Sequence, residues 1–291
     1  MIKLNDELSL SEIVQGFWRL DSWNYTTDDL VKFMNDCIDL GVTSFDTAEI
    51  YGGSEEKMGY ALKDSSIQRD KIQIVTKTGI VAGNGERMSY YDTRYDHIIE
   101  ACKRSLKKLN LEYIDLYLIH REDPCIDPYE VACAFEDLKK DGLIKSAGVS
   151  NFDPFKLDAL RKCYKHDIVT NQIEINPICF EHFDSGMVDY LTCNKIHPMI
   201  WSPLAGGRLF TNNDVKCERV RKVLDKLSKK YEVGPETIVF AWLLYHPVKA
   251  IPLSGSKQIV RLKNSLKAFE IKLSHDEWYE IYTASGQKAL R

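Results

Sequence analysis

Residues 113–149 read YIDLYLIHREDPCIDPYEVACAFEDLKKDGLIKSAGV and contain one complete strand–helix–strand unit. The runs 113–120 and 144–149 have the apolar character of strands that are covered on both faces. An apolar stripe at helical spacing lies between them, formed by Val131, Ala134, Phe135 and Leu138. Strands that alternate with a covering helix in this way predict an α/β protein with a parallel sheet.

The same alternation extends over the whole chain of 291 residues. Further strands are predicted over 42–47, 72–77, 168–175, 198–202 and 250–253, with another near 11–18 and a short hairpin over 2–10. Strand ends recur about one βα unit apart, and roughly eight units in this length favour a closed (β/α)8 TIM barrel. An open doubly wound sheet is the alternative, but the G-x-G-x-x-G that usually follows its first strand is absent. We therefore predict one barrel domain over residues 1–291.

Local signals mark where helices begin. Thr26 or Thr27 can cap a helix whose apolar stripe follows, and Asp153 precedes Pro154 as an N-cap precedes the first helical residue. Ser274, with a glutamate three residues later, reads as a capping box that opens a C-terminal helix.

Composition excludes several classes of protein. The 39 Lys and Arg against 43 Asp and Glu give a net charge of −4, which argues against a nucleic-acid partner. The longest apolar run, 238–245, is too short to span a bilayer, and residues 1–10 lack the apolar core of a signal peptide. The eight cysteines form no C-x-x-C and are expected to be thiols, so we expect a cytoplasmic protein without a membrane partner.

Four polar residues stand where a barrel places its active site, at the carboxyl ends of neighbouring strands. Asp46, Lys77 and His120 end three predicted strands, and Tyr51 follows the first of them in a loop. Each has an ordinary explanation when taken alone: a helix cap, an amine that reaches solvent, a structural histidine and a packing tyrosine. Their occurrence at consecutive strand ends predicts a site.

Together these residues suit proton transfer to a carbonyl oxygen. Asp46 can neutralise a buried Lys77, whose charge is expected to lower the pKa of Tyr51 from its reference near 10. His120 can bind the same substrate oxygen and orient or relay the proton. No side chain donates hydride, so a reduced nicotinamide is the natural electron source.

These residues lie in motifs through which the chain resembles the aldo-keto reductase family. The resemblance runs nearly end to end, through DTAEIYG (46–52), IVTK (74–77), DLYLIH (115–120), GVSNF (148–152), NQIEINP (171–177), WSPL (201–204) and GSK (255–257). More loosely, Trp-Arg at 18–19 and His-Arg at 120–121 resemble a branch of poorly characterised bacterial oxidoreductases.

The resemblance implies that Tyr51, assisted by Asp46, Lys77 and His120, reduces aldehydes or ketones to alcohols with NADPH. It implies that three residues hold the nicotinamide carboxamide, namely Ser150, Asn151 and Gln172. It also implies that Trp201 stacks on the nicotinamide ring, although Trp201 could be ordinary core. A loop across the pyrophosphate would be formed by Ser202, Leu204, Gly206, Gly207 and Arg208, where glycines let backbone N–H groups approach an anion.

The last predicted strand leads to a further candidate cofactor-binding segment, which is basic. It is formed by Gly255, Ser256, Lys257 and Arg261. A phosphate at a helix N-terminus gains from free N–H groups, and the two basic side chains suit a 2′-phosphate, which favours NADP(H) over NAD(H). A helix capped by Ser256 with solvated basic residues is the alternative. Many relatives place Glu-Asn after the arginine for adenine contacts, and here Asn264 can take over part of that role.

Substrate contacts are predicted where the chain departs from many relatives near its first strand. The candidates are Trp18, Arg19, Trp23 and Arg121, and the arginines could bind a carboxylate or phosphate of the substrate or form surface salt bridges. The long stretch 79–95 is expected to be a loop over the pocket. The partner is expected to be a small aldehyde or ketone, and the chain a monomer or weak oligomer.

Three other functions fit parts of this pattern. Lys77 could be the nucleophile of a Schiff-base aldolase, but that leaves the contexts of Tyr51 and Trp201 unexplained. His120 and Asp46 could bind a metal in a hydrolase, but H-x-H and H-E-x-x-H are absent, and we expect no metal. A cofactor-binding accessory or redox-sensing subunit with little turnover is the third alternative, against which the retention of all four catalytic residues argues.

Overall fold

Eight strands form a closed barrel in the part of the chain that the computed structural model describes, residues 1–63 and 65–288. Each of these eight strands overlaps a predicted one, and none extends more than one residue beyond it, so the predicted (β/α)8 TIM barrel is confirmed. Neighbours in the barrel follow chain order: β3 (Val14–Gly16), β4 (Ser44–Asp46), β5 (Gln73–Thr78), β8 (Ile114–Ile119), β9 (Ile144–Ser150), β10 (Ile168–Glu174), β11 (Met199–Trp201) and β12 (Ile251–Ser254).

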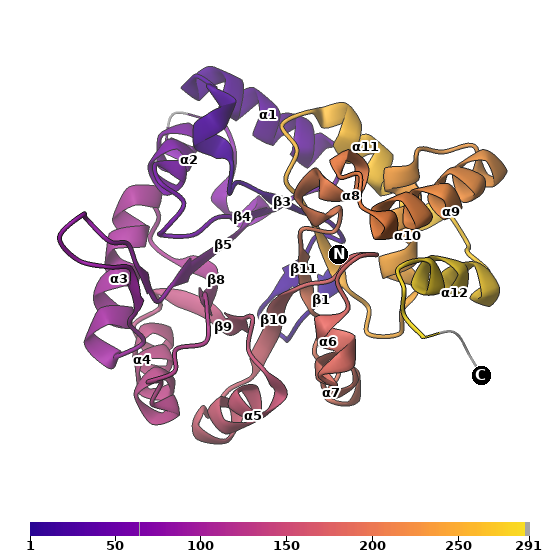
Figure 1. Ribbon diagram of the computed structural model, residues 1–291. Helices are drawn as coiled ribbons and strands as arrows, with labels where there is room; N and C mark the ends of the chain where they lie inside the picture. Colours follow the sequence, from indigo (N-terminus) through magenta and orange to yellow (C-terminus); the bar gives the residue numbers. More distant parts are fainter. Residues whose placement is uncertain (64, 289–291) are drawn as a thin grey trace. The chain divides into compact units, whose positions relative to one another are not determined.

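Contacts divide the chain into two compact units, Met1–Gln172 and Ile173–Arg291. The boundary falls inside β10, and the single domain over residues 1–291 remains a prediction. In the first unit, Figure 1 shows α2 to α5 following one another around the outside of the strands. Its helices are α1 (Thr27–Asp39), α2 (Ser54–Lys63), α3 (Tyr95–Leu109), α4 (Pro128–Lys140) and α5 (Pro154–Cys163), with the 3-10 helices η1 (Leu20–Trp23) and η2 (Arg69–Lys71).

The second unit carries more helices than one for each strand. Between β11 and the long helix α9, the chain forms a short 3-10 turn and a single helical turn, η3 and α8. The helices of this unit are α6 (Glu181–Asp184), α7 (Met187–Cys193), η3 (Ala205–Gly207), α8 (Arg208–Thr211), α9 (Val215–Tyr231), α10 (Pro235–Tyr245), α11 (Ile259–Leu266), η4 (Lys267–Glu270) and α12 (His275–Ala284). None of the helices among the described residues is long and apolar enough to cross a lipid bilayer.

The predicted helix caps are present. Thr26, rather than Thr27, caps α1, because its hydroxyl accepts the N–H of Asp29 at 3.1 Å. Asp153 caps α5 by accepting the N–H of Lys156 at 2.8 Å. The backbone N–H of Ser274 donates to the Glu277 carboxylate at 2.9 Å, which completes a capping box at α12. These side chains bond N–H groups that a first helical turn cannot pair internally.

Short hairpins flank the barrel strands of the first unit. The predicted hairpin near the N-terminus is present as β1 (Ile2–Lys3) and β2 (Ser9–Leu10), which pair antiparallel. The stretch 79–95, expected to be a loop, contains a second small antiparallel pair, β6 (Ile80–Val81) and β7 (Tyr90–Tyr91). Tyr90 and Tyr91 are exposed.

The register of the barrel strands aligns the polar strand ends of the first unit. Asp46 pairs with Val75 on β5, two residues before Lys77. Lys77 pairs with Leu118 on β8, and the His120 N–H donates to the Thr78 carbonyl at 2.8 Å. Asp46, Lys77 and His120 therefore lie at the same end of three adjacent strands.

Candidate active site

A buried ion pair forms the base of the cluster at these strand ends. The Lys77 side chain is 0% exposed, and its Nζ lies 2.7 Å from Asp46 Oδ1 and donates to the Thr47 carbonyl, also at 2.7 Å. Burial acts to lower the pKa of Lys77, but the Asp46 carboxylate and Tyr51 act in the opposite direction and leave that pKa raised. Lys77 is therefore a buried cation whose charge is balanced by its partners.

Tyr51 lies between this cation and an imidazole. Its Oη is 3.5 Å from Lys77 Nζ and 3.5 Å from His120 Nε2, and its ring packs edge-on against the His120 ring with centroids 5.5 Å apart. Both polar contacts are long for hydrogen bonds. The cluster thus brings together the four residues that the sequence analysis predicted to form a site.

The expected lowering of the Tyr51 pKa is wrong in its net direction. Burial raises the pKa of Tyr51 above 10 and outweighs the Lys77 charge, which does act to lower it as expected. The sequence places a cation near the phenol but does not reveal how completely the site is desolvated. The consequence is a phenol that stays protonated at neutral pH and can serve as an acid.

His120 is held in its neutral form. Burial lowers its pKa well below the usual 6.5, and the positive charges of Lys77 and Arg121 lower it further. A neutral ring can accept or donate one hydrogen bond at Nε2, depending on its tautomer. His120 is therefore suited to orienting an oxygen, and a relay through its protonated form is disfavoured.

The three residues expected at the ends of β9 and β10 also lie together. The Ser150 hydroxyl donates to the Gln172 carbonyl at 2.7 Å, and the Asn151 amide donates to Ser150 Oγ at 2.8 Å and to the His120 carbonyl at 3.1 Å. Asn151 has a φ of 60°, a left-handed conformation that asparagine tolerates better than most residues. Asn151 therefore links the end of β9 to the end of β8.

Gln172 has a role that the sequence did not indicate. Its Nε2 donates to Asp46 Oδ2 at 2.8 Å, so the two carboxylate oxygens of Asp46 are bound by Lys77 and Gln172 respectively. This contact joins residues that are 126 positions apart, and no local pattern predicts it. Gln172 supports the buried ion pair in addition to its expected cofactor role.

In the second unit, the expected pyrophosphate loop has an unusual backbone. Ser202, Ala205, Gly206 and Gly207 all have positive φ, and a Cβ added to Gly207 would meet no atom within 4 Å. Trp201 and Leu204 are partly exposed beside this loop, and the Arg208 Nε donates to the Ala205 carbonyl at 3.0 Å. A backbone that turns through left-handed residues can aim N–H groups at an anion.

The expected 2′-phosphate segment leads into α11. The α11 cap is Gln258, whose N–H donates to Ser256 Oγ at 3.1 Å, so Ser256 stands two residues before the cap position. Gly255, Lys257 and Arg261 are exposed here. Asn264 donates its amide to Glu236 Oε1 at 3.1 Å. A basic, solvent-accessible helix start is therefore present.

The four predicted substrate contacts occupy different environments. Trp18 is 61% exposed, and the Arg19 guanidinium lies 5.1 Å from its ring centroid. Trp23 is 6% exposed and packs against Phe17 with ring centroids 5.6 Å apart. Arg121 is partly buried, and its charge acts on Tyr51 and His120. These substrate contacts stay predictions.

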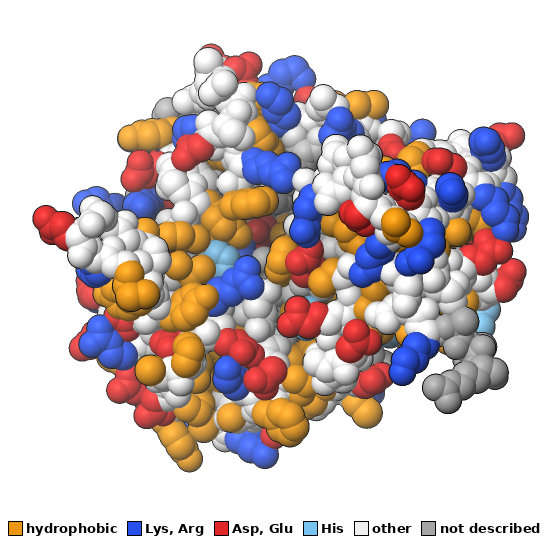
Figure 2. All heavy atoms as spheres, in the orientation of Figure 1, with side chains coloured by type: hydrophobic (Ala, Val, Ile, Leu, Met, Phe, Trp, Pro, Cys, Tyr) orange, Lys and Arg blue, Asp and Glu red, His pale blue; other side chains and the backbone are white. Residues whose placement is uncertain are grey.

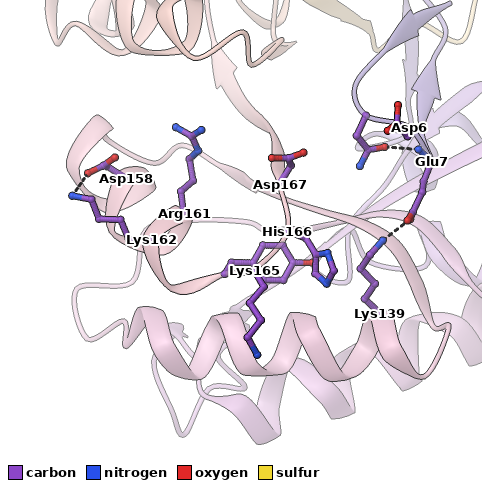
Figure 3. A pocket seen from close by; sticks show the side chains of 11 residues that line it. Asp6, Glu7, Lys139, Asp158, Arg161, Lys162, Lys165, His166 and Asp167 are labelled. Atoms are coloured by element: carbon purple, nitrogen blue, oxygen red, sulfur yellow. Dashed lines mark hydrogen bonds and ion pairs between the residues drawn. The ribbon is translucent and has the colours of Figure 1, made fainter.

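A groove of about 630 Å³ lies elsewhere in the first unit, where α5 ends and β10 begins. Figure 3 shows ion pairs joining Lys139 to Glu7 and Lys162 to Asp158 along it. None of the four clustered residues lines this groove.

On the face of the molecule that is seen in Figure 2, acidic and basic side chains are interspersed. No group of three or more His, Cys, Asp or Glu that could hold a metal occurs in residues 1–63 and 65–288.

A closed (β/α)8 barrel with polar side chains gathered at its strand ends is the architecture of the TIM-barrel enzymes. The model of the Aldo/keto reductase family matches residues 12–285. The chain belongs to this family, as its motifs predicted.

Relatives and solved structures agree with this assignment. Uncharacterized oxidoreductase YcsN of Bacillus subtilis is 40% identical over 292 residues, with 97% of each chain covered. The 6-dehydroglucose reductase of Agrobacterium fabrum is 37% identical over 296 residues, with 99% of each covered. A crystal structure of a thermostable aldo-keto reductase in complex with the inhibitor epalrestat aligns with a TM-score of 0.83 at 27% identity, covering 98% of each chain.

Proposed function

We propose that this protein reduces aldehyde or ketone carbonyls to alcohols with NADP(H), and that Tyr51 is the general acid. One observation carries the proposal: the Tyr51 Oη lies 3.5 Å from the buried Lys77 ammonium and 3.5 Å from the neutral His120 ring. A substrate oxygen that reaches Tyr51 and His120 would therefore meet a proton donor and an orienting nitrogen in one place.

The proton step follows from the charges of the site. Tyr51 is protonated before the reaction, because burial raises its pKa. As negative charge develops on the carbonyl oxygen, the proton passes from Tyr51 Oη to that oxygen. The Lys77 cation at 3.5 Å stabilises the phenolate that remains, and Asp46 keeps Lys77 charged and oriented. Solvent then returns a proton to Tyr51.

The cofactor assignment rests on two groups of residues. NADPH, when bound, supplies the hydride that reduces the carbonyl carbon. Ser150, Asn151 and Gln172 would hold its carboxamide, and Trp201 would stack on its ring. The open, positive-φ backbone at Gly207 suits a pyrophosphate, in a loop that also includes Ser202, Leu204, Gly206 and Arg208.

A preference for NADP(H) rests on the basic start of α11. Lys257 and Arg261 are exposed there, where a 2′-phosphate would gain from both positive charges and from the helix N-terminus. Gly255 and Ser256 form the turn before the helix, and Asn264 would contribute to the adenine side. All eight cysteines are free thiols, which suits the reducing cytoplasm that we propose as the place of action.

The test measures turnover and cofactor binding separately. The purified protein is mixed with NADPH and a panel of aldehydes and ketones, and the fall in NADPH absorbance is followed. Tyr51→Phe is expected to lower kcat by about 100- to 10,000-fold, the usual range for a lost general acid, with NADPH affinity unchanged. Tyr60→Phe, at an exposed tyrosine of α2, is the control and should behave as wild type.

Two outcomes would contradict the proposal. Wild-type turnover by Tyr51→Phe would show that Tyr51 is not the acid. NADPH binding by the wild-type protein with no turnover across the panel would instead favour the accessory or redox-sensing role.

A further inference from the structure

The turn that follows Tyr51 is held by a carboxylate from another segment. Asp21, in the 3-10 helix η1, accepts the Gly53 N–H at 2.8 Å with Oδ2. Its other oxygen, Oδ1, lies 2.7 Å from the ammonium of Lys57 on α2. Asp21 thus binds both the turn and the helix that the turn opens. The sequence pattern predicted a role for Trp18 and Arg19 in this segment but none for Asp21.

Gly52 is shaped to this contact. Its φ of +57° is a left-handed conformation, and a Cβ added there would lie 2.2 Å from Asp21 Oδ2. The carboxylate therefore occupies the space that a side chain at position 52 would need. The residue next to Tyr51 lacks a side chain for both a conformational and a steric reason.

The preceding end of the same loop is held by the strand that carries Lys77. The Thr47 N–H donates to the Val75 carbonyl at 2.8 Å, and the Glu49 N–H donates to the Lys77 carbonyl at 3.1 Å. Tyr51 therefore lies on a short span of chain with β5 at one end and Asp21 at the other. The buried Ser54 hydroxyl also attaches the segment after Tyr51, since it donates to the Phe17 carbonyl at 3.1 Å and accepts from the Thr47 hydroxyl at 2.9 Å. Asp21 is the attachment that acts on the turn itself, at Gly53.

We propose that Asp21 is a positioning residue for Tyr51, which holds the phenol at its place between Lys77 and His120 through the Gly53 N–H. This inference rests on the proposed role of Tyr51 as the acid. Misplacement of a reacting group by about 1 Å can lower a rate by about 100-fold, so a contact at Gly53, two residues from the proposed acid, is expected to affect turnover.

The ion pair of Asp21 with Lys57 and its hydrogen bond from Gly53 are expected to differ in how strongly they hold the turn. The side chains of Asp21 and Lys57 are 50% and 39% exposed, and exposed ion pairs contribute little because water and salt screen them. The bond from the Gly53 N–H acts directly on the turn. Substitutions that remove only the ion pair are therefore expected to be mild, and those that remove the N–H acceptor severe.

The kinetic test compares variants that separate these bonds. Asp21→Ala removes both and is expected to lower kcat by about 10- to 100-fold at unchanged NADPH affinity, and to increase the solvent deuterium isotope effect. Lys57→Met leaves the acceptor of Asp21 in place and should stay within about threefold of wild type. Gly52→Ala, which displaces the carboxylate with Asp21 present, should reproduce the loss. Asp70→Ala, at an exposed aspartate on η2, is the control.

A second measurement reports the position of Tyr51 without any turnover. Fluorotyrosine is incorporated at position 51 alone, and its fluorine NMR signal is expected to shift or broaden in Asp21→Ala and Gly52→Ala but not in Lys57→Met or Asp70→Ala. If the wild-type protein reduces no carbonyl and the signal still moves, the proposed function fails while the positioning role stands. If folded Asp21→Ala retains the wild-type fluorine signal, the inference is overturned, whatever the activity. Unchanged kcat and isotope effect in Asp21→Ala would overturn it as well.

Discussion

Two opposed effects act on the pKa of the Tyr51 phenol, the charge of Lys77 and the burial of the site. Lys77 favours the phenolate, and the burial that makes this cation effective disfavours the same phenolate. Burial prevails, and the pKa of Tyr51 is raised. In the proposed reaction the Lys77 charge would act later, when the phenolate forms.

His120 offers the most direct test at the scale of a single residue. Its pKa lies well below 6.5, because burial and two neighbouring cations disfavour the charged ring. At pH 6.5, where an ordinary histidine is half protonated, the nitrogen NMR signals of His120 are therefore expected to be those of a neutral imidazole. His120→Gln identifies the signals by their loss. A half-protonated ring at that pH would contradict the assigned environment.

Among the elements, the start of α11 decides the predicted cofactor preference. The Lys257→Ala, Arg261→Ala double variant is expected to weaken NADPH binding by about tenfold or more, equivalent to about 1.4 kcal/mol, and to leave NADH binding nearly unchanged. NADPH carries a 2′-phosphate that the Lys257 and Arg261 charges would contact, and NADH has no such phosphate. Fluorescence titration at two salt concentrations measures this, and the difference between cofactors should shrink at high salt.

A matched control for this prediction is Lys263→Ala, which removes an exposed positive charge from a later turn of the same helix. Equal losses of NADPH and NADH affinity in the double variant would count against the 2′-phosphate assignment. An equal effect of Lys263→Ala would point to a general charge effect.

At the scale of the whole molecule, cofactor binding should stabilise the native state by mass action. A ligand that binds only the folded chain at about 100 times its Kd adds about 2.7 kcal/mol to the free energy of unfolding. The melting temperature is therefore expected to rise with NADPH concentration, and equally in Tyr51→Phe, whose phenol is not assigned to cofactor binding. Differential scanning fluorimetry checks both. An unchanged melting temperature at saturating NADPH would contradict the cofactor assignment.

The sequence by itself determined the barrel strands, the helix caps and the order of the motifs. These depend on neighbours within one strand or one helical turn, so apolar runs such as 113–120 and caps such as Asp153 carry the information locally. The same reasoning brought Asp46, Lys77 and His120 to one end of the barrel, because parallel strands place their carboxyl ends together.

The tertiary structure decided what depends on burial and on contacts between distant residues. It set the direction of the Tyr51 pKa, the support of Asp46 by Gln172 and the hold of Asp21 on the turn at Gly53. Each of these joins segments far apart in the chain or depends on how much water the folded site excludes. No local pattern encodes either quantity, since both arise only when the strands and loops are packed together.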